Sequence, residues 1–318
     1  MRILVTGGAG FIGSHFVDLL LTHLDEDSEV LVYDKLTYAG SINNLKSALV
    51  DSRVKFIEGD IVDAQAVARV FNGITHVINF AAESHVDNSI KDSTEFIRSN
   101  ILGVQVLLDA ALKFQVQKFV QVSTDEVYGS IESGSWDEDS PLSPNSPYAA
   151  SKAAADLLVR SYVVTHGLNA SISRCSNNYG ARQFPEKIIP LFVKRLSHLQ
   201  KVPLYGNGLN SRDWLHVEDH CYALWLILTS GGSGEIYNIG GGKELTNYDL
   251  TIRIVEFFQS DVDNWIEFVE DRKGHDHRYS VNYSKISREL GYSPRIDFED
   301  AFPQVLSFLA TSYGERNG

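Results

Sequence analysis

Cysteine is scarce in this chain of 318 residues, which contains only Cys175 and Cys221. Two thiols far apart in the sequence exclude a disulfide framework, and they fit no metal-binding spacing. Long apolar runs are also missing, since none approaches the about 18 residues that a membrane-spanning helix needs. The first residues, MRILVTGG, read directly into a strand and carry no signal peptide. We therefore expect a cytoplasmic protein with no membrane partner.

Positive charge is in short supply as well. The chain has 28 Lys and Arg against 41 Asp and Glu, which gives a net charge of −13 at pH 7. This balance argues against nonspecific binding to nucleic acid or to an acidic membrane surface. An anionic ligand has to be met by cations that are gathered locally against this field. Hydrophobic residues make up 43% of the chain and charged residues 22%, as in an ordinary globular protein.

Strand and helix patterns alternate through about the first 170 residues. Short apolar runs predict strands that are buried on both faces of a parallel sheet. The alternation indicates βαβ units and a Rossmann-type, doubly wound α/β fold. The predicted strands are Arg2–Thr6, Glu29–Asp34, Val54–Glu58, His76–Phe80, Lys118–Ser123 and Ser171–Arg174, and the predicted helices are Phe11–His23, Ala64–Phe71, Asp92–Phe114 and Tyr148–His166.

The pattern changes after Arg174. The segment CSNNYGARQFPEKIIP is rich in Asn, Gly and Pro and indicates a loop. We predict helices at 189–199, 217–229, 248–258 and 298–310, a turn-rich stretch at 202–221 with a strand at its end, and a further strand at EIYNIGG. We expect 175–318 to form a smaller α/β substrate-binding lobe, interleaved with the domain 1–174, to which the chain returns near 211–240.

A glycine motif follows the first predicted strand. In ILVTGGAGFIG, Gly7, Gly10 and Gly13 open a helix, and their bare backbone lets a pyrophosphate approach the helix N-terminus. Asp34 ends the second strand, 21 residues after Gly13. A carboxylate there hydrogen-bonds the adenosine 2′-hydroxyl and repels a 2′-phosphate, so NAD is favoured over NADP. The alternative is an ordinary tight turn without a ligand, but the strand–turn–helix context favours an NAD-binding Rossmann domain over residues 1–174.

Other predicted strand ends meet at the same edge of the sheet, where ligands bind in such folds. GDI, residues 59–61, follows the third strand and is placed to hold an adenine. FAAESHVD follows the fourth strand, and its Ala81 and Ala82 are small enough for a cofactor to pass. The same rule puts VSTDEVYG in the crevice.

The stretch FVQVSTDEVYGS ends a buried strand with two adjacent acids, Asp125 and Glu126. Burial of an unpaired carboxylate is costly, so the acids are either solvated loop residues or groups that a reaction needs. SPYAASK then places Tyr148 and Lys152 four residues apart, on one face of a helix. A lysine beside a phenol favours the phenolate, which makes Tyr148 a candidate base for a substrate hydroxyl. Taken alone, such a pair is more often an unrelated surface pair.

Together, these motifs resemble the extended short-chain dehydrogenase/reductase superfamily. Within it, AAESHVDNSI, STDEVYGS, NNYG with QFPEKIIP, RDWLHVEDH and DRKGHDHRY are similar to the dTDP-glucose 4,6-dehydratases, and the similarity runs nearly end to end. Related sugar-nucleotide epimerases and decarboxylases lack the Asp-Glu pair. The resemblance also implies a homodimer that pairs helices 92–114 and 148–166 in a four-helix bundle.

The resemblance implies a reaction with tightly bound NAD that is recycled in each turnover. The C4 hydroxyl of dTDP-glucose is oxidised, water is lost across C5 and C6, and hydride returns to C6, which gives dTDP-4-keto-6-deoxyglucose for deoxysugar biosynthesis. Tyr148 is the base at C4, with Lys152 also holding the cofactor ribose, and Thr124 binds the C4 oxygen. Glu126 takes the C5 proton, and Asp125 donates a proton to the departing C6 hydroxyl. Environment can assign such opposite roles to two carboxyl groups.

The predicted binding residues extend over both lobes. Arginine's fork suits phosphate oxygens, so Arg212 and Arg272 are expected on the diphosphate. His275 and His277 lack partners in a metal-binding spacing, and no metal is expected. The predicted cofactor-binding residues are Gly7, Gly10, Phe11, Ile12, Gly13, Asp34, Lys35, Leu36, Thr37, Gly40, Asp60, Ile61, Phe80, Ala81, Ala82, Ser84, Asn100, Val122, Tyr148 and Lys152. The predicted substrate-binding residues are Ser84, His85, Thr124, Asp125, Glu126, Asn177, Glu186, Lys187, Leu191, Pro203, Tyr205, Arg212, Asn247, Arg272 and His275.

Two other functions remain open at this point. An NAD-dependent nucleotide-sugar epimerase or decarboxylase is favoured if Asp125 and Glu126 point away from the nicotinamide. A non-catalytic protein that binds a nucleotide sugar or NAD would not need both Tyr148 and Lys152. Arg182 departs from the pattern of many dehydratases and is either an extra phosphate contact or a surface charge, and Lys273 stands where many have proline.

Overall fold

A seven-stranded parallel sheet forms the centre of the larger lobe in the computed structural model, which describes residues 1–258 and 261–314. Its strand order is β10-β6-β5-β4-β1-β2-β3, so the order reverses between β1 and β4, where doubly wound sheets open a crevice. The predicted fold class is confirmed. All six predicted strands are present, with ends within one residue of the prediction, and the seven strands are β1 (Arg2–Thr6), β2 (Glu29–Asp34), β3 (Val54–Glu58), β4 (His76–Asn79), β5 (Lys118–Thr124), β6 (Ala170–Cys175) and β10 (Ile236–Ile239).

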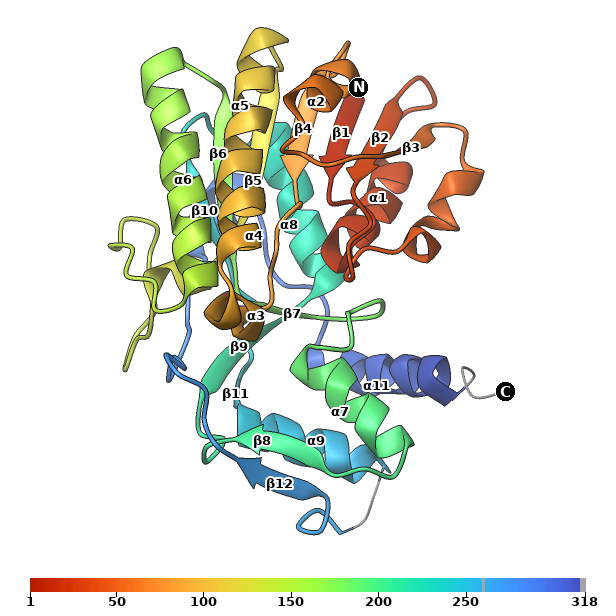
Figure 1. Ribbon diagram of the computed structural model, residues 1–318, viewed down its shortest axis with the longest axis vertical. Helices are drawn as coiled ribbons and strands as arrows, with labels where there is room; N and C mark the ends of the chain where they lie inside the picture. The colour runs from red at the N-terminus through yellow and green to blue at the C-terminus, as the bar shows by residue number, and fades with distance from the viewer. Residues whose placement is uncertain (259–260, 315–318) are drawn as a thin grey trace.

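Helices cover both faces of this sheet (Figure 1). On one face, α1 (Phe11–His23) packs against α8 (Val217–Ser230), and their apolar side chains join the first core cluster. On the other face lie α2 (Ala64–Val70), α5 (Val104–Lys113) and α6 (Pro147–His166). Because both faces are covered, the central strands β1, β4, β5 and β6 are almost wholly buried, as the sequence pattern indicated.

The long helix predicted over Asp92–Phe114 is not one regular element. Two short helices, α3 (Val86–Lys91) and α4 (Thr94–Ile97), precede a π-helical segment, η3 (Arg98–Gly103), which continues into α5. A Cβ atom at Gly103 would lie 2.4 Å from Cδ1 of Ile61, so the wide turn packs closely against the strand-end loop. Such π segments inside α-helices are frequent at functional sites.

The last strand of the central sheet arrives late in the chain. β10 pairs in parallel with β6, after the chain has passed through the second lobe. Lys118, buried at the start of β5, ties this edge together because its Nζ donates to Ser171 Oγ and to the carbonyl oxygen of Gly231, both at 2.7 Å. Burial lowers the pKa of Lys118 to about 8.

The smaller lobe lies beyond the carboxyl ends of the central strands (Figure 1). It contains a three-stranded sheet, β11-β9-β7, and a two-stranded sheet, β12-β8, with helices packed around a third apolar core. The expected helices and the strand at the end of 202–221 are present, whereas β7, β8, β11, β12 and α10 were not predicted. The bounds in the smaller lobe are β7 (Asn177–Tyr179), α7 (Ile188–Ser197), β8 (Val202–Tyr205), β9 (Ser211–His216), β11 (Glu244–Thr246), α9 (Asn247–Phe258), β12 (Ile266–Val269) and α11 (Phe298–Gly314). The helix α10 (Ser284–Leu290) packs instead against β10 and α8 of the larger lobe. The remaining elements are the 3-10 turns η1 (Ile42–Leu45), η2 (Ala48–Val50) and η4 (Asp125–Tyr128).

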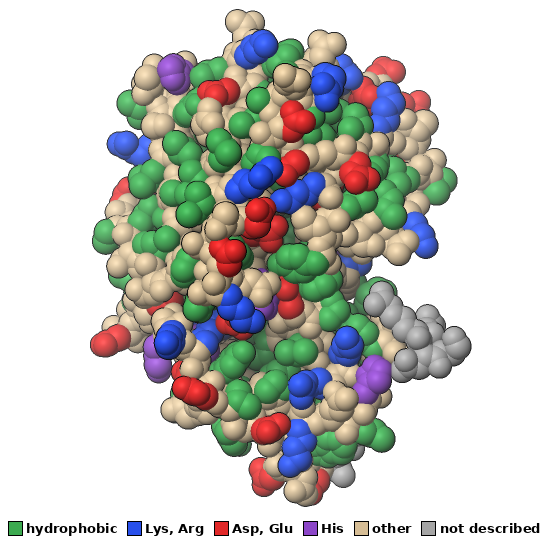
Figure 2. Space-filling view, viewed as in Figure 1, with side chains coloured by type: hydrophobic (Ala, Val, Ile, Leu, Met, Phe, Trp, Pro, Cys, Tyr) green, Lys and Arg blue, Asp and Glu red, His purple; other side chains and the backbone are tan. Residues whose placement is uncertain are grey.

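Charges of both signs are interspersed over the face drawn in Figure 2, with apolar side chains between them. Neither lobe gathers one sign of charge into a broad patch on this face. No helix within 1–258 and 261–314 is long and apolar enough to span a membrane. In the same ranges, no group of three or more His, Cys, Asp or Glu side chains is placed to hold a metal ion.

Candidate active site

A cavity of about 290 Å³ opens at the carboxyl edge of the central sheet, where the strand order reverses between β1 and β4. Its walls come from the ends of β1, β2, β4, β5 and β6, from the first turns of α1 and α6, and from the segment that follows β7. Residues that are far apart in the chain therefore meet around one space, as the strand-end rule predicts.

The glycine motif forms one wall of the cavity. Gly7 has a φ of +69°, and a Cβ atom there would lie 2.4 Å from the amide nitrogen of Ala81. A Cβ atom at Gly13 would lie 2.4 Å from the carbonyl oxygen of Gly7. Gly10 caps α1 without a side chain, which leaves the helix N-terminus open to the cavity. The wall therefore offers bare backbone amides to a pyrophosphate.

Asp34 is held rigidly at the end of β2. One carboxylate oxygen accepts a hydrogen bond from the amide of Ala9 at 3.0 Å, and the other accepts from the amide of Leu36 at 2.9 Å. Burial raises the pKa of Asp34, while these two hydrogen bonds oppose the shift. The carboxylate lines the cavity and has acceptor capacity left for a ribose hydroxyl.

Eighteen of the twenty predicted cofactor-binding residues line the cavity, and Leu36 and Asn100 do not. Leu36 contributes its backbone amide to Asp34 instead. The side chain of Asn100 accepts from the amide of Glu83 and donates to the carbonyl oxygen of Glu83 and to Ser151 Oγ. Asn100 therefore fixes a wall of the cavity from behind. Cavity-lining residues that were not among the predicted site residues are Tyr33, Ala39, Gly59, Glu83, Ser99, Ser123, Cys175, Ser176, Asn178, Gln183 and Phe184.

Buried polar atoms around this space call for a polar ligand. Among the described residues, Oδ2 of Asp125 and Oδ1 of Asn177 are buried and have no hydrogen-bond partner, and both residues line the cavity. Leaving such atoms unpaired is costly. Together with the glycine wall and Asp34, they fit a dinucleotide that enters with a hydroxyl-bearing substrate.

The two adjacent acids lie where β5 gives way to η4. Thr124 ends the strand, and its Oγ1 accepts from the amide of Glu126 at 3.3 Å, which starts the turn. Asp125 is only 2% exposed, and its pKa is raised well above the ordinary value by burial, then by Glu126 and by Asp213. Asp125 is thus suited to carry a proton at neutral pH.

Glu126 has a different environment from its neighbour. Burial raises its pKa, but the cations Arg272, Lys187 and Arg212 oppose the shift. The net effect leaves Glu126 more readily ionised than Asp125, so the pair divides into an acid and a base.

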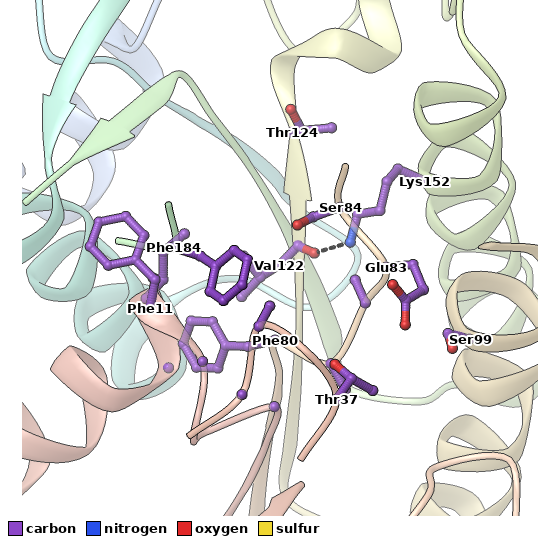
Figure 3. A pocket seen from close by; sticks show the side chains of 18 of the residues that line it. Phe11, Thr37, Phe80, Glu83, Ser84, Ser99, Val122, Thr124, Lys152 and Phe184 are labelled. Carbon is purple, nitrogen blue, oxygen red and sulfur yellow. Dashed lines mark hydrogen bonds between the residues drawn. The ribbon is translucent and has the colours of Figure 1, made fainter. Parts of the chain in front are cut away.

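Tyr148 and Lys152 face the same cavity from the first turns of α6. The helix begins where Ser146 Oγ accepts from the amide of Ala149 at 3.1 Å, and Pro147 occupies its first turn. Lys152 Nζ donates to the carbonyl oxygen of Val122 at 2.6 Å, the dashed contact in Figure 3.

The pKa of Tyr148 is raised well above its ordinary value, first by burial and then by Glu126, and a hydrogen bond to Thr124 opposes the shift. Burial disfavours the charged form of Lys152 as well and lowers its pKa, although Asp156 opposes this shift. The sequence predicted that Lys152 favours the phenolate form of Tyr148. In the chain without cofactor, burial has the larger effect and raises the pKa of Tyr148. A positively charged ring in the cavity would oppose this shift and favour the phenolate.

Seven predicted substrate residues line the same cavity, namely Ser84, Thr124, Asp125, Glu126, Asn177, Glu186 and Lys187. The other eight do not line it. Four of these eight, His85, Tyr205, Arg272 and His275, lie around Asp87 and Glu186. Arg272 Nη1 is 3.8 Å from Asp87 Oδ1, Tyr205 donates to the same carboxylate at 3.4 Å, and His85 Nε2 is 3.9 Å from Glu186 Oε2. The ring of Tyr205 packs edge-on against His275.

Arg212 lies deeper in the smaller lobe. Its guanidinium stacks 4.4 Å from the ring centre of Tyr279 and donates to the carbonyl oxygens of Asp276 and Ser211. Of the remaining predicted residues, Leu191 lies on α7, Pro203 on β8, and Asn247 starts α9. The structure therefore separates a cofactor and reaction end from a cationic end.

Arg182 does not reach the cavity. It pairs with Asp18 on α1 at 2.5 Å and donates to the carbonyl oxygen of Asn44 at 2.9 Å. The sequence left two interpretations of Arg182, a phosphate contact or a surface charge. Its contacts with Asp18 and Asn44 fit neither of them.

Comparisons with known proteins agree with the motifs. The sequence profile of the family described as GDP-mannose 4,6 dehydratase matches residues 4–305. A dTDP-glucose 4,6-dehydratase of Actinoplanes sp. is 54% identical over 312 residues, which cover 97% of each chain. The low-salt glycan biosynthesis protein Agl12 of Haloferax volcanii is 49% identical over 308 residues, which cover 97% of this chain and 98% of the other. The resemblance drawn from the motifs is confirmed.

Solved structures show the same fold. The crystal structure of DesIV, a dTDP-glucose 4,6-dehydratase from Streptomyces venezuelae with NAD and dTDP bound, superposes with a TM-score of 0.96 at 51% identity, covering 99% of this chain and 98% of that one. A UDP-glucuronic acid 4-epimerase from Bacillus cereus, in complex with UDP-glucuronic acid and NAD, reaches a TM-score of 0.92 at 28% identity, covering 98% and 100%. Since dehydratases and epimerases share this architecture, the residues in the cavity have to distinguish the reaction.

Proposed function

Since this chain belongs to the nucleotide-sugar dehydratase family described as GDP-mannose 4,6 dehydratase, we propose that it is an NAD-dependent hydro-lyase that converts dTDP-glucose to dTDP-4-keto-6-deoxyglucose in deoxysugar biosynthesis. Thr124, Asp125, Glu126, Tyr148 and Lys152 are the proposed catalytic residues, and all five line one cavity. The cofactor is NAD, held by the glycine wall and Asp34, and it stays bound between turnovers.

The first step oxidises the sugar at C4. NAD, when bound, supplies a hydride acceptor at C4 and later a hydride donor at C6. Tyr148 removes the C4 hydroxyl proton as the C4–H hydride leaves, which turns the alcohol into a ketone. The hydroxyl of Thr124 lines the same cavity as Tyr148 and donates to Asp125 Oδ1 at 3.3 Å in the chain alone, and it is proposed to donate to the ketone oxygen during the reaction. Lys152 supports the negative charge of the phenolate.

The second step removes water across C5 and C6. The C4 ketone acidifies the C5 hydrogen, and Glu126 takes that proton. The electron pair of the C5–H bond forms the C5–C6 double bond as the C6–O bond breaks, and Asp125 gives the departing hydroxyl its proton. Hydride addition at C6 and proton return from Glu126 to C5 then yield the 4-keto-6-deoxy sugar. Asp125 regains a proton from solvent and Tyr148 gives up the proton that it took from the C4 hydroxyl, which closes the cycle.

One observation carries this proposal over an epimerase or decarboxylase. Asp125 and Glu126 both line the cavity with Tyr148, rather than turning away from it. Oxidation at C4 alone needs only the tyrosine, the lysine and the hydroxyl. A buried acid with a raised pKa beside a second carboxylate is a costly arrangement that an elimination uses and a simple epimerisation does not. A non-catalytic binding protein would need neither pair.

The direct assay incubates the purified protein with dTDP-glucose and no added cofactor. We expect a 4-keto product, detected by its absorbance after treatment with base. If no hexose nucleotide gave such a product, the proposal would be wrong.

The Asp125→Asn variant separates the two steps. Without the acid, C4 oxidation continues but elimination slows, by about a hundredfold or more, as is typical when general acid catalysis is lost. Stopped-flow absorbance should show reduced cofactor accumulating in the variant. The matched control is Asp139→Asn, an exposed acid in the loop before α6 that does not line the cavity. Normal turnover by Asp125→Asn would contradict the acid assignment.

We also propose how the molecule is organised around this site. Residues 1–174, with the return near 211–240, bind NAD, and 175–318 bind the nucleotide, with Arg212 and Arg272 at the diphosphate. Two copies associate through Thr94–Lys113 and α6, and the enzyme works in the cytoplasm. The buried free thiols of Cys175 and Cys221 support a reducing compartment, and exposed apolar side chains on the outer helices support a dimer.

A further inference from the structure

We propose that Arg182 is a positioning residue that holds residues 180–187, here called the strap, against α1 and thereby retains NAD in the cavity. The inference rests on the proposed function for the identity of the cofactor. The strap follows β7 and leads into α7, both in the smaller lobe, and Arg182 joins it to α1 of the larger lobe. Phe184, Glu186 and Lys187 of the strap line the same cavity as the glycine wall.

The side chain of Arg182 fastens the strap at three points. Nη2 pairs with Oδ2 of Asp18 at 2.5 Å and lies 3.4 Å from Nδ1 of His15, one turn earlier on α1. Nη1 donates to the carbonyl oxygen of Asn44 in η1, at 2.9 Å. One guanidinium therefore joins the strap to the helix that carries the glycine motif and to the loop after β2.

His15 on α1 also contacts the strap next to Arg182. Its Nε2 lies 2.9 Å from the carbonyl oxygen of Ala181, the neighbour of Arg182. Burial and Arg182 lower the pKa of His15 to about 4, so the ring is neutral at physiological pH. A neutral ring that donates from Nε2 leaves Nδ1 free to accept from the guanidinium, so both contacts agree with one tautomer.

The backbone at Arg182 indicates that these contacts are needed to fix the strap. Its φ is +65°, a left-handed conformation that is unfavourable for a residue with a side chain. Such a conformation persists when surrounding contacts determine it. Here they are the ion pair with Asp18 and the hydrogen bond to Asn44.

The other end of the strap is fastened to the opposite wall. Lys187 Nζ donates to the carbonyl oxygen of Ser84 at 2.9 Å, and Phe184 packs edge-on against Tyr38, with ring centres 5.4 Å apart. Figure 3 shows Phe184, Phe11 and Phe80 gathered on one side of the pocket. A dinucleotide on the glycine wall therefore lies beneath the strap and leaves only when the strap lifts.

The rate of cofactor exchange tests the proposal directly. Holoenzyme is mixed with an excess of isotopically labelled NAD, and mass spectrometry follows replacement of the bound cofactor. Arg182→Gln and Asp18→Asn should each exchange about fivefold to thirtyfold faster than the unchanged protein, the factor that one or two broken charged contacts produce. Because both variants break the same ion pair between Arg182 and Asp18, the double variant should exchange NAD no faster than Arg182→Gln alone.

A matched control separates retention from general loosening. Arg253 on α9 pairs with Glu299 at 2.5 Å and does not line the cavity, so Arg253→Gln removes a similar ion pair elsewhere. Thermal unfolding of each protein stripped of NAD measures its stability. Exchange by Arg182→Gln within twofold of the unchanged protein overturns the proposal, and so does equal acceleration by Arg253→Gln. Asp18 is partly exposed, so Asp18→Asn keeps the test decisive if the Arg182 variant does not fold.

Cofactor exchange needs no turnover, so the outcome is independent of the sugar substrate. If dTDP-glucose is not converted but exchange accelerates as expected, the strap proposal stands and the proposed function fails. If the dehydratase assay succeeds but exchange is unchanged, the opposite holds.

Discussion

A proton on Asp125 is the most demanding feature of the site at the scale of single residues. The carboxyl group is 2% exposed, and two other acids, Glu126 and Asp213, act on it through a low-dielectric interior. Asp213 cannot turn away, because its oxygens accept from the amides of Gly241 and Lys243. The raised pKa of Asp125 is therefore built into the fold, and folding takes up protons at this group above the pKa of the unfolded chain.

Replacing Asp125 by asparagine should stabilise the protein increasingly as pH rises. In the unfolded chain Asp125 ionises near pH 4, whereas in the folded protein it stays protonated to a higher pH. Across that window the folded state binds more protons, so the free energy of unfolding falls with pH, by up to about 1.4 kcal/mol per pH unit from this group. The amide of the Asp125→Asn variant does not titrate and has no such dependence. Denaturant unfolding of both proteins between pH 4 and 7 measures the difference, and a constant difference would show that the folded-state pKa is not raised.

The sequence predicted which side chains lie close together at those positions that the ends of strands determine. Gly7, Asp34, Ala81 and Thr124 all line one cavity because parallel strands end at one edge. Phe184 was missed because it belongs to a loop whose path depends on the contacts of Arg182. Asn100, which was predicted to bind the cofactor, hydrogen-bonds the backbone of Glu83, and no sequence pattern indicated this contact or the π segment η3 that carries Asn100.

At the scale of elements, α6 shows how a helix end supports chemistry. Its first turns carry Tyr148 and Lys152, and the amide of Tyr148 also donates to Ser89 Oγ at 3.1 Å. Ser146 determines where the helix starts. Alignment of the phenol with the substrate therefore depends on a capping hydroxyl outside the cavity.

The Ser146→Ala variant should lose about 1 kcal/mol of unfolding free energy, the usual contribution of an N-cap. Fraying of the first turn should also lower kcat more than it raises KM, because Tyr148 moves relative to the sugar. Ser161→Ala is the matched control, since Ser161 lies on the exposed part of the same helix. Denaturant titration and steady-state kinetics give both readouts, and equal effects of the two variants would contradict the role of the cap.

Short edge elements were the hardest to predict from the sequence. The strands of the large sheet are apolar runs, since helices cover both faces, and their bounds were predicted almost to the residue. β12 presents Phe268 to solvent and pairs only with β8, so tertiary pairing rather than pattern makes it a strand. The uniform helical pattern over 92–114 gave no sign that η3 widens.

At the scale of the whole molecule, apolar side chains on the outer helices indicate association. Ile97 is 53% exposed, Leu157 57% and Val164 70%, on α4 and α6. Figure 1 shows α5 and α6 side by side on the outside of the large lobe. Two such pairs packed together would form the proposed four-helix bundle.

Leu157→Glu should therefore convert a dimer to a monomer. A charge in a closed apolar interface is strongly unfavourable, and it costs little on an exposed surface. Leu209→Glu, at a comparably exposed leucine in the smaller lobe, should leave the association unchanged. Sedimentation velocity distinguishes the two species. A monomeric unchanged protein at micromolar concentration, or a dimeric Leu157→Glu variant, would rule out this interface.

The late arrival of β10 determines when the central sheet can be completed during synthesis. The edge of β6 stays unpaired until residues 236–239 have left the ribosome, because no earlier segment takes their place in the sheet. Until then the nascent chain carries an open strand edge, the kind of surface through which chains aggregate. The acceptors at Gly231 and Gly232 that receive the ammonium of Lys118 also emerge only at this stage. Nearly three quarters of the chain must therefore be synthesised before the cofactor-binding lobe can close its sheet.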